Sequence, residues 1–277
     1  MLEKSDFLKK SDFLVVELKR KIIKMNEELE LILIKEIEAL KAELAQLKAQ
    51  EIKEVPIYLF SKMTFAKLHQ LFNLKINITQ EIFDNWFNNN IELHKNDIEF
   101  FTDLIHNNSF LIESYKEEDL KVKFITPILN RIKFLDTEIQ FRDFYEEKIT
   151  YQTSEFILTG QTDFLIAKGL ESSEKPYFFI QEFKKSIKND DPRPQLLAEL
   201  IAAVELNNFT SMRGAYIVGA IWNFVILKKL AKHKYQYFVS RNFDSTDLEK
   251  LKDIYKNLLF VKKEIKQLIA SEIRNDN

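Results

Sequence analysis

Residues 157–186 read "ILTGQTDFLIAKGLESSEKPYFFIQEFKKS", and this stretch decides how the rest of the chain is interpreted. Two apolar runs, "TDFLIA" and "YFFIQEF", flank the polar segment "KGLESSEKP", in which Gly169 and Pro176 fit a turn. The stretch therefore predicts a β-hairpin. Both faces of the second run are apolar before its charges begin, which is typical of a central strand covered on both sides.

Alternation along the second strand assigns its side chains to two faces. One face is expected to carry Phe178, Ile180, Glu182 and Lys184, and the other Tyr177, Phe179, Gln181 and Phe183. Glu182 and Lys184 then emerge together at the end of a buried strand. Asp163 lies in the partner strand, where its carboxylate could meet Glu182 across the ladder.

Two carboxylates in a partly desolvated place repel each other unless a cation lies between them. Mg²⁺ would remove that conflict, because it takes oxygen ligands and keeps several waters. A lysine on the same face, Lys184, could then orient a water or stabilise charge on a phosphate. The pattern predicts metal-assisted hydrolysis of a phosphodiester. Taken alone, Glu182 and Lys184 favour a simple ion pair at a strand end, because an acid-x-Lys sequence occurs by chance in many proteins.

The segments around the hairpin predict an α/β or α+β fold. A helix is expected at 116–134, with Leu120, Phe124, Ile128 and Ile132 on one face. Three β-like runs follow, then a helix that begins near Pro194, two or three further strands up to residue 239, and a last helix over about 246–272.

"GQTDFLIA" followed by "QEFKKS", with Glu182 nineteen residues after Asp163, resembles the PD-(D/E)XK nuclease superfamily. The superfamily pattern is an Asp on one core strand and an acid-x-Lys on the next. Its restriction endonuclease-like core is a helix, a three-strand meander, a crossover helix and another strand, and residues 116–239 can be assigned in that order. The resemblance covers about half of the chain, and Thr162-Asp163 replaces the "PD" dipeptide.

The resemblance implies a site that binds Mg²⁺, for which Mn²⁺ could substitute. Asp163 and Glu182 would hold the metal together with the main-chain carbonyl of Phe183. Lys184 would position the attacking water and stabilise the pentavalent state.

Two helices would contribute the remaining catalytic residues that the resemblance implies. Gln195 would brace the site from the crossover helix, with Glu199 one turn further on. Glu117, in the helix before the meander, could reach a second metal or its waters, and Glu118 is the other candidate for that role.

A nucleic-acid surface has to be local, because the formal net charge of the chain is −2. The residues expected to contact phosphates are Lys185, Lys188, Arg193 and Arg213, although each could simply be a solvated charge. "KEEDLKVKFITPIL" resembles the opening helix of nuclease domains in type I restriction subunits. DNA is therefore the favoured substrate, and a role in restriction or defence is implied by resemblance.

The N-terminal region carries a heptad pattern flanked by Glu and Lys. Its apolar positions are Leu18, Ile22, Met25, Leu29, Leu33, Ile37, Leu40, Leu44 and Leu47. The pattern predicts a coiled coil over residues 1–55, which would join two copies into a homodimer, or else a helix folded back on its own chain. Residues 56–115 are expected to form a helical region, and 116–277 the nuclease-like domain.

Composition excludes several classes of protein. The chain has no Cys, so disulfides, thiol catalysis and Cys-ligated zinc are excluded. No run approaches the roughly 18 apolar residues of a membrane span, and no stretch is like a signal peptide, so a cytoplasmic protein without a membrane partner is expected. Two alternatives stay open, namely a non-catalytic nucleic-acid or protein binding module, and a different α/β fold in which the motif is coincidental.

Overall fold

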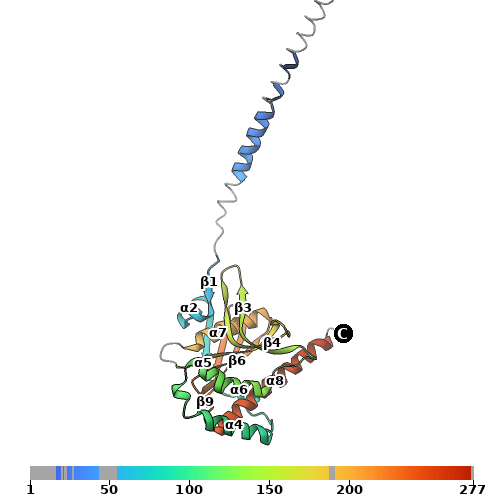
Figure 1. The fold of residues 1–277 in the computed structure, drawn as a ribbon. Helices are drawn as coiled ribbons and strands as arrows, with labels where there is room; N and C mark the ends of the chain where they lie inside the picture. The colour runs from blue at the N-terminus through green and yellow to red at the C-terminus, as the bar shows by residue number, and fades with distance from the viewer. Residues whose placement is uncertain are drawn as a thin grey trace, which may run out of the picture. The chain divides into compact units, whose positions relative to one another are not determined.

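The computed structural model describes residues 17–19, 21, 24–26, 28–43, 55–186 and 191–275 (Figure 1). The chain divides into two compact units, Met1–Glu54 and Val55–Asn277. In the described part of the chain, no helix combines the length and the apolar character that crossing a membrane requires.

In the first unit, every described residue is helical. The seam residues that the structure describes are exposed by 49–61%; they are Leu18, Met25, Leu29, Leu33, Ile37 and Leu40. The seam positions Ile22, Leu44 and Leu47 lie outside the described residues. Within this unit, the described helix thus leaves its apolar side chains without a core of their own.

The second unit contains the remaining helices and strands. Its α-helices are α2 (Phe65–Leu71), α3 (Asp84–Phe87), α4 (Lys95–Asn108), α5 (Glu117–Leu120), α6 (Thr126–Ile132), α7 (Pro192–Leu206) and α8 (Leu248–Asn275). Short 3-10 turns are η1 (Phe60–Lys62), η2 (Glu81–Phe83) and η3 (Ile112–Ser114), and η4 (Lys121–Ile125) is a π-helical turn between α5 and α6. The strands are β1 (Ile57–Leu59), β2 (Asn73–Asn77), β3 (Phe141–Gln152), β4 (Ile157–Lys168), β5 (Glu174–Lys184), β6 (Ser211–Val218), β7 (Ile221–Ala231), β8 (Lys234–Val239) and β9 (Phe243–Asp244).

These strands form one mixed sheet with the order β1-β4-β5-β6-β7-β8-β2, to which β3 adds at β4 and β9 at β7. The long strands β3, β4 and β5 are an antiparallel meander. Helix α7 then crosses over to β6, which pairs with β5 in parallel. The remaining long strands, β7 and β8, continue antiparallel.

Helices cover both faces of this sheet, so the unit has three layers. Side chains of α4, α6 and α8 pack against one face, in a cluster that includes Phe164, Phe179 and Phe183. Figure 1 shows these three helices gathered in the lower part of the unit. Helix α7 covers the other face, where its buried leucines meet Leu165 and Ile180. The two apolar faces that the sequence predicts for β5 follow from this arrangement.

The mixed α/β class and the predicted meander, crossover helix and last helix are confirmed. The prediction that 56–115 is a separate helical region is wrong in part, because β1 and β2 belong to the sheet. β1 pairs in parallel with β4 and β2 in parallel with β8, so both strands depend on partners distant in the sequence. Residues 55–277 therefore form one unit.

Candidate functional site

Asp163 and Glu182 lie side by side where β4 and β5 stop pairing. The ladder between these strands ends at Phe164 and Gln181. One step beyond, the Asp163 amide donates to Glu182 Oε1 at 3.3 Å, and the Phe183 amide donates to Asp163 Oδ2 at 2.8 Å. The splayed strand ends thus expose main-chain donors that hold both carboxylates.

A bulge corrects the predicted faces of β5. Ile166 is paired with Phe179, but Ala167 is paired with Tyr177, so Phe178 is the extra residue. As a result Phe178 packs in the same cluster as Phe179, while Tyr177 lies on the Ile180 face. The bulge lies upstream of the charged end, so Glu182 keeps its predicted position on the Ile180 face.

A third carboxylate, that of Glu199, reaches this place from α7. Both Glu182 and Glu199 are fully buried. The close approach of α7 depends on Gly214 in β6, where a Cβ would come within 3.1 Å of Leu200 and 2.8 Å of the Ile180 carbonyl. Gln195, which the sequence predicts to brace the site, donates to Glu199 Oε1 at 3.1 Å. Sequence analysis placed Glu199 one turn from Gln195 without giving it a role, because only the packing of α7 puts it against β5.

Glu182 and Glu199 form a buried pair of carboxyl groups, whose negative charges would repel each other. Burial raises the pKa of Glu182 well above its ordinary value, the negative charges of Glu199 and Asp163 raise it further, and Lys184 offsets this only in part. Burial also raises the pKa of Glu199, to about 8, against the opposing hydrogen bonds from Glu182 and Gln195. Oε2 of each glutamate is buried and receives no hydrogen bond from a neighbouring donor. Burial and the neighbouring carboxylates therefore both favour the protonated form of Glu182.

Lys121 is a member of this site that sequence analysis missed. Its Nζ lies 3.0 Å from Asp163 Oδ1, 3.6 Å from Glu117 Oε1 and 3.7 Å from Glu118 Oε1. Although burial disfavours the ammonium charge, the attraction of Asp163 and the two glutamates raises the pKa of Lys121. Glu117 thus reaches the site through Lys121.

The position of Lys121 follows from an irregularity in its helix. The segment 117–132 begins as α5, passes through the π turn η4 at Lys121 and resumes as α6. A π turn inserts one residue and re-aims the side chains that follow, and such turns are frequent at functional sites. The predicted apolar face is preserved, since Leu120, Phe124, Ile128 and Ile132 are all buried. The four-residue spacing of these apolar positions therefore gives no signal of the inserted turn.

The predicted basic residues are only partly brought to this site. Lys184 is partly exposed beside the glutamates, and its charge acts on Glu182. Lys185 lines a cleft of about 710 Å³ at the carboxyl ends of β5 and β6, where the Gly219 amide donates to the Lys184 carbonyl at 2.9 Å. Arg193 pairs with its neighbour Asp191 at 2.7 Å. Lys188 lies outside the described residues.

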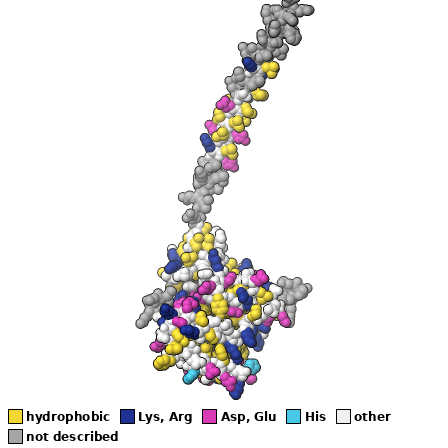
Figure 2. Space-filling model, in the orientation of Figure 1, with side chains coloured by type: hydrophobic (Ala, Val, Ile, Leu, Met, Phe, Trp, Pro, Cys, Tyr) yellow, Lys and Arg dark blue, Asp and Glu magenta, His cyan; other side chains and the backbone are white. Residues whose placement is uncertain are grey.

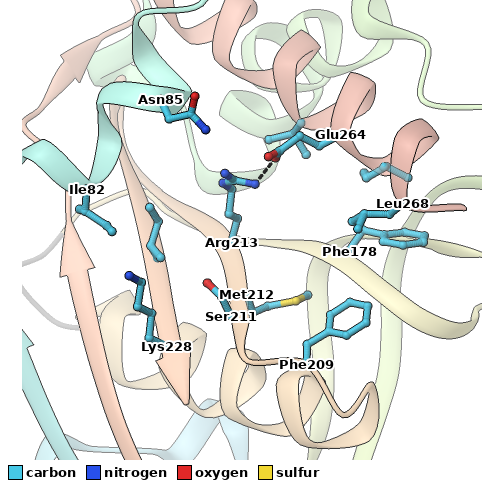
Figure 3. Close-up of a pocket in the computed structure, with 13 residues that line it drawn as sticks. Ile82, Asn85, Phe178, Phe209, Ser211, Met212, Arg213, Lys228, Glu264 and Leu268 are labelled. Carbon is cyan, nitrogen blue, oxygen red and sulfur yellow. Dashed lines mark hydrogen bonds and ion pairs between the residues drawn. The ribbon is translucent and has the colours of Figure 1, made fainter. Parts of the chain in front are cut away.

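Arg213 lies on the opposite face of the sheet. Its guanidinium pairs with Glu264 of α8 and lies 4.9 Å from the Trp86 ring centre. Figure 3 shows the two charged groups directed toward one another in a cavity of about 390 Å³, lined also by Phe178, Met212 and Lys228. The structure does not bring Arg213 together with Asp163 and Glu182. Figure 2 shows acidic and basic side chains interspersed over the visible face of this unit.

The donor set suits a metal that needs few protein ligands. Among the described residues, no group of three or more acidic or histidine side chains is arranged to hold a metal ion. Mg²⁺, however, is commonly bound through one or two carboxylates, with waters and substrate phosphate as the other ligands. Asp163 and Glu182 supply two carboxylates, and Glu182 Oε2 is a buried oxygen without a donor. These residues fit the ion that the sequence predicts.

Searches for related proteins add no further constraint, since no protein-family model and no curated protein matches this chain.

Proposed function

We propose that this protein is a Mg²⁺-dependent endonuclease of the PD-(D/E)XK type, which hydrolyses phosphodiester bonds in DNA. The observation that carries the proposal is the pair Asp163 and Glu182, held at the splayed ends of β4 and β5 with Lys184 on the same strand. Beside this pair, Glu182 and Glu199 each keep a buried oxygen without a donor, and such buried carboxyl groups are costly unless they bind a cation.

The order of elements supports a restriction endonuclease-like core. A helical segment, the meander β3-β4-β5, the crossover helix α7 and the parallel strand β6 follow one another, with the helices on opposite faces. Residues 116–218 have this order, which is the one that the resemblance implies. Ligands in open sheets with crossover connections commonly bind at the carboxyl ends of parallel strands, which is where Glu182 and the Lys185 cleft lie.

Each residue of the site has a chemical role in this proposal. Asp163 and Glu182 bind Mg²⁺, and the metal supplies charge stabilisation and an activated water. Lys184 orients that water. Gln195 holds Glu199 by its hydrogen bond, and the Phe183 peptide fixes the orientation of Asp163. Lys185 contacts the phosphate backbone from the adjoining cleft.

We propose further that the N-terminal helix pairs with that of a second copy. Its exposed apolar residues recur with heptad spacing between charged flanks, which is the pattern of a two-stranded coiled coil. A homodimer would carry two cleavage sites, one for each strand of a duplex. Removing residues 1–54 should therefore give a monomer in analytical ultracentrifugation.

A non-catalytic nucleic-acid binding module is the rival function, and one observation favours it. Lys121 already neutralises Asp163, as it would in a domain that has no use for a metal. The rival predicts nucleic-acid binding without any metal-dependent cleavage.

The deciding experiment is a cleavage assay with an isosteric variant. Supercoiled, linear and single-stranded DNA and RNA are incubated with the full chain in Mg²⁺, Mn²⁺ or EDTA. We expect nicking or cutting of DNA with either metal and none in EDTA. Asp163→Asn should reduce the rate at least about a hundredfold, because a metal ion contributes several kcal/mol of transition-state stabilisation.

Asp253→Asn is the matched control, because Asp253 makes only an exposed pair with Lys250 on α8. This variant should cleave like the natural sequence. Equal cleavage by Asp163→Asn, or no cleavage with either metal, would refute the nuclease proposal.

A further inference from the structure

Asp163, Glu182 and Glu199 form an acidic site, and the Lys121 ammonium is a cation that already contacts it. It contacts Asp163 Oδ1 at 3.0 Å, and its side chain is only 18% exposed. Its Nζ also lies 5.7 Å from the centre of the Phe183 ring. Asp163 Oδ2 is already bonded to the Phe183 amide, so Lys121 contacts the oxygen that remains.

An ammonium and a divalent ion cannot share this oxygen at low cost. Both would lie within about 4 Å of each other in a partly buried place, where like charges repel strongly. A single neighbouring charge changes the affinity of a carboxylate for a proton by about one to three powers of ten. A neighbouring positive charge lowers the affinity of the carboxylate for a metal cation for the same reason that it lowers the affinity for a proton.

The structure also provides a second location for the ammonium. Glu117 Oε1 and Glu118 Oε1 are 3.6 and 3.7 Å from Lys121 Nζ, on the turn that precedes it in the helix. A small rotation of the lysine side chain toward either glutamate would release Asp163. Glu117 is the less exposed of the two, at 39% against 79%.

We infer that Lys121 is the cation that a divalent metal displaces from Asp163, and that Glu117 receives the displaced ammonium. Lys121 thereby sets the metal affinity of the site, and Glu117 acts through Lys121 as a positioning residue instead of binding a second metal. This inference rests on the proposed function, since it takes Asp163 as a metal ligand.

A set of four variants tests the inference by calorimetric titration of the full chain with Mn²⁺ alone, without nucleic acid. Lys121→Gln should bind Mn²⁺ about tenfold more tightly than the natural sequence, because the competing charge is gone. Glu117→Gln should bind it a few-fold more weakly, because the ammonium then stays on Asp163. Lys123→Gln is the control of equal charge, since Lys123 pairs with exposed Asp119; it should leave the affinity unchanged.

The double variant separates the two roles of Glu117. If Glu117 acts only by receiving Lys121, then Glu117→Gln has no further effect in the Lys121→Gln background. A metal-binding Glu117 would weaken Mn²⁺ binding in both backgrounds, which would overturn its positioning role. A thermal melt of each variant in EDTA verifies that it is folded before titration.

The Mn²⁺ titration and the cleavage assay can give negative results independently, so the inference about Lys121 and the nuclease proposal are tested separately. Unchanged or weaker Mn²⁺ binding by Lys121→Gln overturns the inference, even where cleavage that depends on Asp163 supports the proposed function. Tighter binding by Lys121→Gln with no cleavage of any nucleic acid supports the inference and refutes the nuclease proposal. Absence of Mn²⁺ binding by both the natural sequence and Lys121→Gln overturns the inference as well.

Discussion

Two groups of partly or fully buried charged side chains lie on opposite faces of the same sheet, and their charges are balanced in one group and unbalanced in the other. On the α8 face, Arg213 is paired with Glu264, so a cation and an anion satisfy each other. On the α7 face, Glu182 lies against Glu199, with Asp163 as a third carboxylate. Both groups are attached to neighbouring strands, β5 and β6, within one sheet.

The pKa shifts of the glutamates express this difference. At Glu264, burial raises the pKa and Arg213 opposes the rise. At Glu182, burial raises the pKa and the nearest carboxylates add to the rise. The charges of Arg213 and Glu264 balance each other in the folded chain, whereas the neighbouring carboxylates of Glu182 add to its charge conflict. An imbalance of charge therefore distinguishes a candidate functional site from a structural ion pair. The burial of charge does not distinguish them by itself.

The largest expected effect is on activity, from Glu182→Gln. Under the proposed function Glu182 is a metal ligand, so its loss should lower the cleavage rate at least about a hundredfold. Unfolding by urea in EDTA should show a free energy equal to or above that of the natural sequence, because a like charge has been removed from the buried pair. A marked loss of stability would contradict the contrast between the two groups.

Glu264→Gln should have the reverse signature. It leaves Arg213 without its anion, and breaking a fully buried pair costs roughly 3–5 kcal/mol. Because both side chains here are more than a quarter exposed, we expect a loss of about 2 kcal/mol in the free energy of unfolding. The cleavage rate per folded molecule should not change. A variant that is stable but inactive would place Glu264 in the functional site.

The smallest expected effect is a pH dependence, measured by urea unfolding in EDTA. The folded-state pKa of Glu199 is raised to about 8 from an ordinary value of 4.5, so the folded state binds more protons between these values. The stabilising contribution is complete below pH 4.5 and is lost as the pH rises through about 8.

Glu199→Gln removes this titration. The natural sequence should therefore lose stability relative to Glu199→Gln between pH 5 and 8.5, by on the order of 1–2 kcal/mol. Parallel profiles for the two proteins would mean that the pKa of Glu199 is not raised in the folded state.

Much of the acidic site follows from local sequence because it depends on two regular patterns. Alternation along β5 and a hairpin to β4 are sufficient to put Asp163 beside Glu182, and the structure brings them together. The bulge at Phe178 escaped prediction, since one extra residue in a continuous apolar run leaves no trace in composition. The short strands β1 and β2 escaped it because they gain their hydrogen bonds from distant strands.

Sequence by itself determined the apolar runs of the sheet, the α/β class and the acid-x-Lys motif, because these depend on neighbours in the chain. Only the tertiary structure decided that Lys121 and Glu199 join Asp163 and Glu182, and that Arg213 faces away. Lys121 is 42 residues from Asp163 and reaches it through a π turn, and Glu199 arrives by the packing of α7 over Gly214. Charge balance is a property of side chains in contact, so the difference between a balanced ion pair and a cluster of like charges exists only in the folded protein.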